Sequence, residues 1–171
     1  MRKRYLLFTC VLLAAMLIVG ACGQKSTEKK EIPLSENKTI NEGFPLTIED
    51  ALGNTVTLAK KPEKVAVISG QLIDLFCSLG GSTICSVTLD ELTAAKDTAG
   101  QLPVIGSTSA PDLVKIIDLQ PDLVIAEFGL QNDMVFMLQQ SNIPVIALNL
   151  EGEENKKKTV KILKEVAGIK S

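Results

Sequence analysis

Short apolar runs alternate with longer amphipathic stretches along most of this chain. The runs have the length and composition of buried strands, and they lie at residues 65–68, 83–87, 123–126 and 144–148. Apolar residues recur with the period of a helix at residues 71–79, 111–120, 131–141 and 154–166. Continuous apolar strands that alternate with helices predict a parallel sheet covered on both faces. The fold class that we expect is therefore α/β, a Rossmann-like lobe on a parallel sheet.

The segment before the first buried strand follows a different pattern. Leu46, Ile48, Val56 and Leu58 alternate with polar residues on either side of Gly53-Asn54. Alternation of this kind around a Gly-Asn pair predicts a β-hairpin. We therefore expect an N-terminal hairpin within residues 44–58.

Residues 1–21 are typical of an export signal. Basic residues at 2–4 precede an almost wholly apolar run at 5–19, and the small residues Gly20-Ala21 stand before Cys22. We expect cleavage after Ala21 and lipidation of Cys22, which would hold the mature protein on the extracytoplasmic face of the cell membrane. The alternative is an ordinary secretory signal in which Cys22 is incidental.

The rest of the chain divides into a linker and one domain. Residues 22–43 contain few apolar residues, alternating charges and Ser, Asn and Pro, which predicts a flexible tether. Residues 44–171 can form one domain with a real core, and are too few for two. We therefore expect a single α/β lobe over residues 44–171.

Composition excludes several classes of function. Removal of the signal takes away three of the 18 basic residues, so the mature chain carries a net charge of −5, which weighs against nucleic-acid binding. The sequence contains no histidine, and therefore no Ser-His-Asp or Cys-His arrangement. A nucleophile elbow, a phosphate loop and a dinucleotide fingerprint are also missing. We predict a binding protein rather than an enzyme, without catalytic residues, bound metal or cofactor.

Two cysteines fall in the predicted folded part. Cys77 belongs to a helical pattern and Cys85 to a strand-like one. We prefer the interpretation that both cysteines are buried and pack as small hydrophobic residues. A disulfide is the alternative, since an oxidising compartment would allow one.

The topology also predicts where a ligand binds. In an open parallel sheet, ligands gather outside the carboxyl ends of the strands. That rule selects Ser69, Gln71, Ser109, Glu127 and Phe128 as ligand-binding residues. Glu127 and Phe128 are the strongest candidates, the first for a polar or charge contact and the second for packing against the ligand. The alternative to ligand binding is that each residue, taken singly, only lies in a solvated loop. For Phe128 the alternative is a position in the core.

Several segments together resemble a known family. They are the hairpin at 44–58, the stretch LPVIGSTSAPDLVKIIDLQPDLVIA at 102–126 and the strand at 143–150. This order resembles the N-terminal lobe of the substrate-binding lipoproteins of ABC importers for ferric siderophores, haem and cobalamin. The resemblance implies two lobes joined by a long helix, with the ligand held between them. The chain ends where that helix should begin, so we expect half a binding cleft, from a fragment or from a naturally truncated form.

The resemblance also implies a function. The chain would capture an iron complex, a ferric siderophore rather than haem or cobalamin, and deliver it to a membrane permease. Haem-binding relatives can use a methionine at the position of Ser109, and this chain departs from that pattern. Val114 stands where many members have a glutamate that pairs with permease arginines, so the docking salt bridge is not carried over. The alternative is a truncated, non-transporting remnant or a surface interaction module.

Overall fold

The computed structural model describes residues 43–88 and 102–169 of the chain. These residues belong to one compact unit. The predicted signal peptide at 1–21, and residues 22–42 of the predicted tether with the lipidation site Cys22, lie outside the described residues.

The described residues form the predicted strands and helices in the predicted order, with one further strand that was not predicted. The strands are β1 (Leu46–Glu49), β2 (Thr55–Leu58), β3 (Val65–Val67), β4 (Ser86–Thr88), β5 (Val104–Ser107), β6 (Leu123–Glu127) and β7 (Val145–Leu148). The helices are α2 (Gly70–Ser78), α3 (Leu113–Asp118), α4 (Asn132–Gln140) and α5 (Glu153–Val166).

Parallel pairing organises the strands, which confirms the α/β prediction. Strands β3, β6 and β7 form one parallel sheet in that order, and β4 pairs in parallel with β5. The two sheets meet where the Ile84 amide donates to the Val65 carbonyl over 2.9 Å. Strands β1 and β2 form the expected antiparallel hairpin, with Ile48 opposite Val56.

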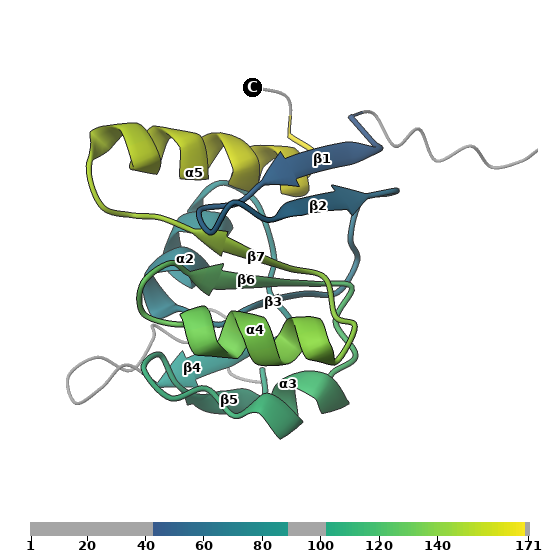
Figure 1. Cartoon of the computed structure of the whole chain (residues 1–171), viewed down its shortest axis with the longest axis vertical. Helices are drawn as coiled ribbons and strands as arrows, with labels where there is room; N and C mark the ends of the chain where they lie inside the picture. Colours follow the sequence, from purple (N-terminus) through teal and green to yellow (C-terminus); the bar gives the residue numbers. More distant parts are fainter. Residues whose placement is uncertain (1–42, 89–101, 170–171) are drawn as a thin grey trace, which may run out of the picture. The chain divides into compact units, whose positions relative to one another are not determined.

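The central sheet is covered on both faces, as the apolar runs predicted (Figure 1). Helices α2 and α5 and the hairpin pack on one face, and α3 and α4 on the other. Successive strand residues alternate between the two cores because side chains alternate across a strand. The side chains that face α2 and α5 are Val65, Val67, Leu123, Ile125, Ile146 and Leu148. Those that face α3 and α4 are Ala66, Ile68, Val124, Ala126, Val145 and Ala147.

Two predicted elements differ in their limits. The strand predicted at 83–87 begins only at Ser86. Before it, the Val67 amide donates to the Thr83 hydroxyl over 3.1 Å and not to a backbone carbonyl of a neighbouring strand. The helix predicted at 111–120 covers only Leu113–Asp118. Asp112 caps its N-terminus, and Gln120 lies in the left-handed region with φ of 50°.

The cysteine prediction is half right. Cys85 is buried, and burial raises the pKa of its thiol to about 11. The prediction that Cys77 is buried is wrong, since Cys77 is exposed and both thiols are free. One step along a helix turns a side chain away from the face that Phe76 buries. Partial burial, and then the charge of Asp74, raise the pKa of the Cys77 thiol.

A buried carboxylate attaches the hairpin to the edge of the sheet. Asp50 is 3% exposed and lies in the hairpin turn. Its carboxylate accepts from the amides of Leu52 and Asn54 over 2.9 and 2.8 Å, and from the Ala147 amide on β7 over 3.1 Å. The Ala51 amide donates to the Ala147 carbonyl over 2.8 Å. The turn therefore continues the sheet beyond β7 and covers an edge that would otherwise expose unpaired backbone.

Candidate ligand-binding edge

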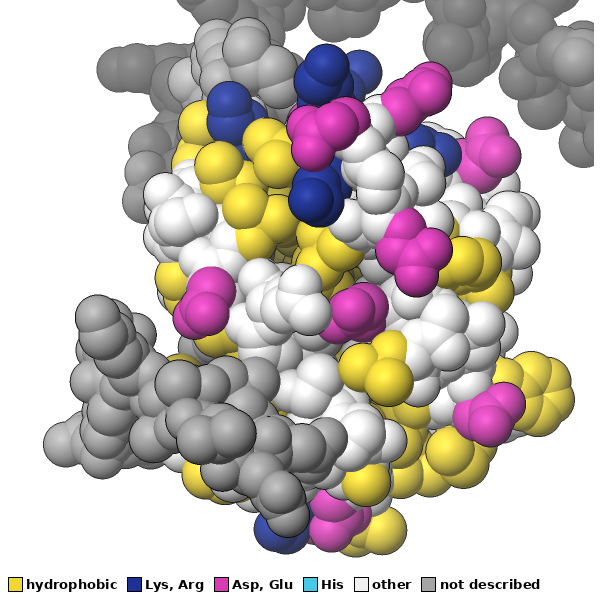
Figure 2. Space-filling model, turned by 90° about the vertical axis from the view of Figure 1, so that its left-hand side faces the viewer, with side chains coloured by type: hydrophobic (Ala, Val, Ile, Leu, Met, Phe, Trp, Pro, Cys, Tyr) yellow, Lys and Arg dark blue, Asp and Glu magenta, His cyan; other side chains and the backbone are white. Residues whose placement is uncertain are grey.

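The parallel strands β3, β5, β6 and β7 end at one side of the molecule. We call this side the carboxyl edge and define it by the residues that follow each strand: 68–69, 108–112, 128–131 and 149–152, together with Glu127 at the end of β6. Figure 2 looks onto this side, where polar surface surrounds scattered apolar side chains. The topology therefore places the predicted ligand-binding residues on a common surface.

Ser69 and Glu127 lie side by side because their strands are in register. Val67 on β3 pairs with Ile125 on β6, so the residues two positions further on are also neighbours. Ser69 is fully buried, and its hydroxyl donates to Oε2 of Glu127. Ser69 thus holds the Glu127 carboxylate in place. The half-buried Glu127 is the member of the pair that a ligand can reach.

A buried glutamine ties three strand ends together. The Gln131 side chain is 3% exposed, and its Nε2 donates to the carbonyls of Ile68 and Thr108, both over 2.7 Å. Its Oε1 accepts from the Glu127 amide over 2.9 Å. One side chain therefore fixes the ends of β3, β5 and β6 relative to one another, which makes the edge a preorganised surface.

Gly106 brings the loop after β5 into the same surface. Its φ of +115° is one that L side chains rarely adopt, and a Cβ there would lie 2.6 Å from the Ala110 carbonyl oxygen. The loop can therefore fold back so that Thr108 Oγ1 accepts from the Gly70 amide over 3.2 Å. This hydrogen bond connects Thr108 to the first residue of α2.

The remaining predicted site residues differ in exposure. Gln71 and Ser109 are exposed, and Phe128 is half-buried. The Phe128 ring packs against the core cluster between the sheet, α3 and α4. The edge thus brings Ser69 and Glu127 into direct contact and leaves Gln71 and Ser109 accessible. Phe128 combines a packing contact with an accessible surface.

Comparison with known proteins identifies relatives over most of the chain. No protein-family model matches the sequence. The ABC transporter substrate-binding lipoprotein YvrC of Bacillus subtilis is 30% identical over 153 residues, which are 87% of this chain and 46% of YvrC. The chain is a homologue of ABC transporter substrate-binding lipoproteins. This finding confirms the resemblance predicted from the sequence.

Other relatives agree with this assignment. The petrobactin-binding protein YclQ of Bacillus subtilis is 29% identical over 73% of this chain and 38% of YclQ. The crystal structure of the periplasmic catecholate-siderophore binding protein VctP of Vibrio cholerae matches with a TM-score of 0.59 and 26% identity, over 72% of this chain and 46% of VctP. The chain spans about half the length, or less, of the substrate-binding relatives that it matches.

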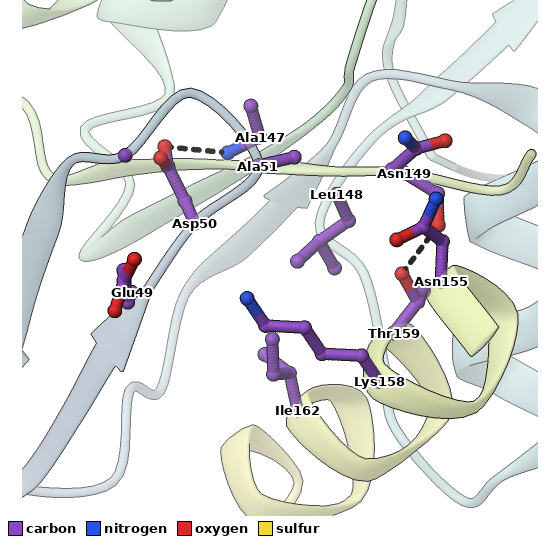
Figure 3. A pocket seen from close by; sticks show the side chains of 11 residues that line it. Glu49, Asp50, Ala51, Ala147, Leu148, Asn149, Asn155, Lys158, Thr159 and Ile162 are labelled. Atoms are coloured by element: carbon purple, nitrogen blue, oxygen red, sulfur yellow. Dashed lines mark hydrogen bonds between the residues drawn. The ribbon is translucent and has the colours of Figure 1, made fainter.

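A pocket adjoins the carboxyl edge (Figure 3). It has a volume of about 330 Å³ and lies between the hairpin turn, the end of β7 and α5. The Thr159 hydroxyl donates to the Asn149 carbonyl over 2.7 Å, and Asn155 Nδ2 donates to the Glu151 carbonyl over 2.9 Å. Lys158 on α5 and Glu49 on β1 line opposite walls. This pocket was not predicted from the sequence, because its walls come from segments about a hundred residues apart.

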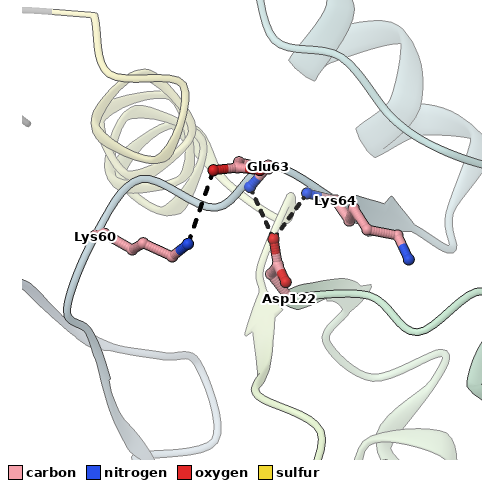
Figure 4. A network of polar contacts seen from close by, with 4 residues as sticks. All are labelled: Lys60, Glu63, Lys64 and Asp122. Atoms are coloured by element: carbon pink, nitrogen blue, oxygen red, sulfur yellow. Dashed lines mark hydrogen bonds and ion pairs between the residues drawn. The ribbon is translucent and has the colours of Figure 1, made fainter. Parts of the chain in front are cut away.

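At the opposite edge of the sheet, one side-chain carboxylate accepts hydrogen bonds from two backbone amides (Figure 4). The Asp122 carboxylate accepts from the amides of Glu63 and Lys64 over 2.9 and 3.0 Å, which joins the starts of β6 and β3. These bonds, chiefly the one from Glu63, lower the pKa of Asp122. Their contribution to stability is present above the ordinary carboxyl pKa of about 3.9 and is lost as pH falls through the lowered value.

None of the helices in the described part of the chain is long and apolar enough to cross a membrane.

Proposed function

We propose that this chain captures a ferric siderophore outside the cytoplasm and delivers it to an ABC permease. The observation that carries the proposal is the similarity to the substrate-binding lipoprotein YvrC over 87% of the chain. The carboxyl edge supports it, because Gln131 and Ser69 hold Glu127 at the place where parallel α/β sheets bind ligands. In this proposal the chain binds and releases its cargo without chemical reaction.

The names of the relatives favour an iron complex. YclQ is named for petrobactin, and VctP for catecholate siderophores. A cobalamin-binding protein of Halobacterium salinarum is 28% identical over 68% of the chain, so cobalamin belongs among the test ligands. Ser109 at the position of a haem-ligating methionine favours a ferric siderophore over haem.

The test is equilibrium dialysis of the purified chain against radiolabelled ferric siderophores, haem and cobalamin. The proposal expects saturable binding of at least one ferric siderophore, and weaker binding of the other two ligands. The absence of saturable binding with every ferric siderophore tried would contradict it.

Phe128→Ala should weaken ferric siderophore binding about tenfold or more, because the accessible part of the ring supplies apolar contact at the edge. It should also lower the free energy of unfolding by about 2 kcal/mol, less than for a fully buried Phe, since the side chain is only partly buried against the core. Phe136→Ala is the matched control, because Phe136 on α4 is 63% exposed. Equal affinities of the Phe128→Ala and Phe136→Ala variants would remove Phe128 from the site.

We also propose that the permease contacts α3 through apolar side chains rather than a salt bridge. Val114 is 64% exposed and Ile117 is 36% exposed on this helix. Val114→Lys should therefore reduce permease-dependent ATP hydrolysis several-fold at saturating ligand, because it places a charge in an apolar contact. Ligand affinity should not change. Unaltered ATP hydrolysis would contradict this docking face.

A further inference from the structure

We propose that the part of the ligand received by the carboxyl edge is neutral or positively charged, as in a ferric trishydroxamate. A strongly negative complex such as a ferric tris-catecholate would be disfavoured. This inference rests on the proposed function and specifies the chemical class of its ligand.

Acidic side chains dominate the carboxyl edge. Glu127 ends β6 and Glu151 lies in the connection after β7. Asp133 stands in the first turn of α4, and Glu153 and Glu154 stand in the first turn of α5. The described connections 68–69, 108–112, 128–131 and 149–152 contain no Lys or Arg. Figure 2 shows the same distribution: acidic side chains cross the middle of this side, and most basic ones gather above it.

The nearest lysines do not reverse this charge. Lys158 lines the adjoining pocket, but Glu49 and Asp50 line it as well. Lys156 lies 3.9 Å from Glu153 in an ion pair. The pocket therefore carries more negative than positive side chains, and it extends the acidic character of the edge.

The helix dipoles are also offset at this edge. Helices α2, α3, α4 and α5 start here, and each N-terminus is equivalent to roughly half a positive charge. Acidic residues in the first turns of α4 and α5 oppose two of these dipoles. Helix α2 has no acid in its first turn, but its N-cap Ser69 holds the Glu127 carboxylate. The Asp112 carboxylate caps the start of α3, so a trianionic ligand would meet carboxylates at all four helix starts.

The common siderophore chelates differ in charge. Three hydroxamates, each singly negative, cancel the charge of Fe³⁺. Three catecholates, each doubly negative, leave an excess of three negative charges. Repulsion between such a complex and nearby carboxylates acts over about a Debye length and weakens as salt is added. The edge therefore favours the trishydroxamate complex.

The test compares the two complexes by equilibrium dialysis with the full chain purified in detergent. At low ionic strength the ferric trishydroxamate should bind at least about tenfold more tightly than the ferric tris-catecholate. Added salt should strengthen tris-catecholate binding and leave trishydroxamate binding nearly unchanged, because only the first is repelled.

A pair of charge variants locates the effect. Glu151→Lys should raise the tris-catecholate affinity about tenfold, because it replaces repulsion by attraction at the edge. Asp118→Lys makes the same change in net charge at the far end of α3, and at about 0.15 M salt, where the Debye length is about 8 Å, it should alter the affinity less than twofold. Both side chains are exposed, so neither variant should unfold the chain.

The outcomes separate this inference from the proposed function. Tighter binding of the tris-catecholate, or equal effects of the two lysine variants, would overturn the inference and leave siderophore capture standing. Saturable binding of neither complex would overturn the proposed function, and this inference with it.

Discussion

Replacing Cys22 by serine should abolish fatty-acid labelling of the chain and release it from membranes. A lipid anchor contributes about 0.8 kcal/mol for each buried CH₂ group, so its loss removes the main attachment. A net charge of −5 gives the mature chain no electrostatic attraction to anionic lipids. The measurements are incorporation of a fatty-acid analogue and the distribution between membrane and soluble fractions.

Cys10→Ser is the matched control, because Cys10 lies within the predicted signal and would be removed with it. This variant should be labelled and anchored like the unaltered chain. Equal labelling of Cys22→Ser and the unaltered chain would show that Cys22 is not the acceptor.

Asp50→Ala should lower the free energy of unfolding by about 3 kcal/mol. The substitution leaves the buried amide of Ala147 without its acceptor and releases the turn amides of Leu52 and Asn54. Unsatisfied buried donors cost about 1–3 kcal/mol each, and the turn amides can recover part of this loss with water. Chemical denaturation followed by circular dichroism measures the change.

Two variants of the same turn serve as controls. Asp50→Asn keeps one acceptor oxygen and should lose less stability than Asp50→Ala. Glu49→Ala removes an exposed carboxylate from the neighbouring residue and should change the free energy of unfolding by no more than about 0.5 kcal/mol. If the Asp50→Ala and Glu49→Ala variants have the same free energy of unfolding, the Asp50 carboxylate does not anchor the hairpin.

Most of the fold was predictable because its signals are local. The four apolar runs and the hairpin pattern each appear within a few residues, and each predicted run overlaps an observed strand. Strand β5 was not predicted, because Gly106 interrupts its short apolar run. The environment of Cys77 was predicted wrongly, because the position lies beside the buried face of α2 and not on it.

The site was only partly predictable. The adjacency of Ser69 and Glu127 follows from parallel register once β3 and β6 are neighbours. The roles of Gln131 and Asp50 do not follow, because their side chains bond backbone atoms 63 and 97 residues away. A polar residue beside a turn or a helix start looks the same in sequence whether it faces water or holds two strands together.

In the proposed function, the carboxyl edge receives an iron complex. Paramagnetic broadening of amide signals tests it most directly, by comparing a ferric siderophore with its diamagnetic gallium counterpart on the isotopically labelled chain. We expect the amides of Gly70, Thr108 and Phe128 to lose intensity with iron. The amides of Lys64 and Asp122 at the opposite edge should keep theirs. Broadening centred on Lys64 and Asp122, or none at any edge, would contradict this proposal.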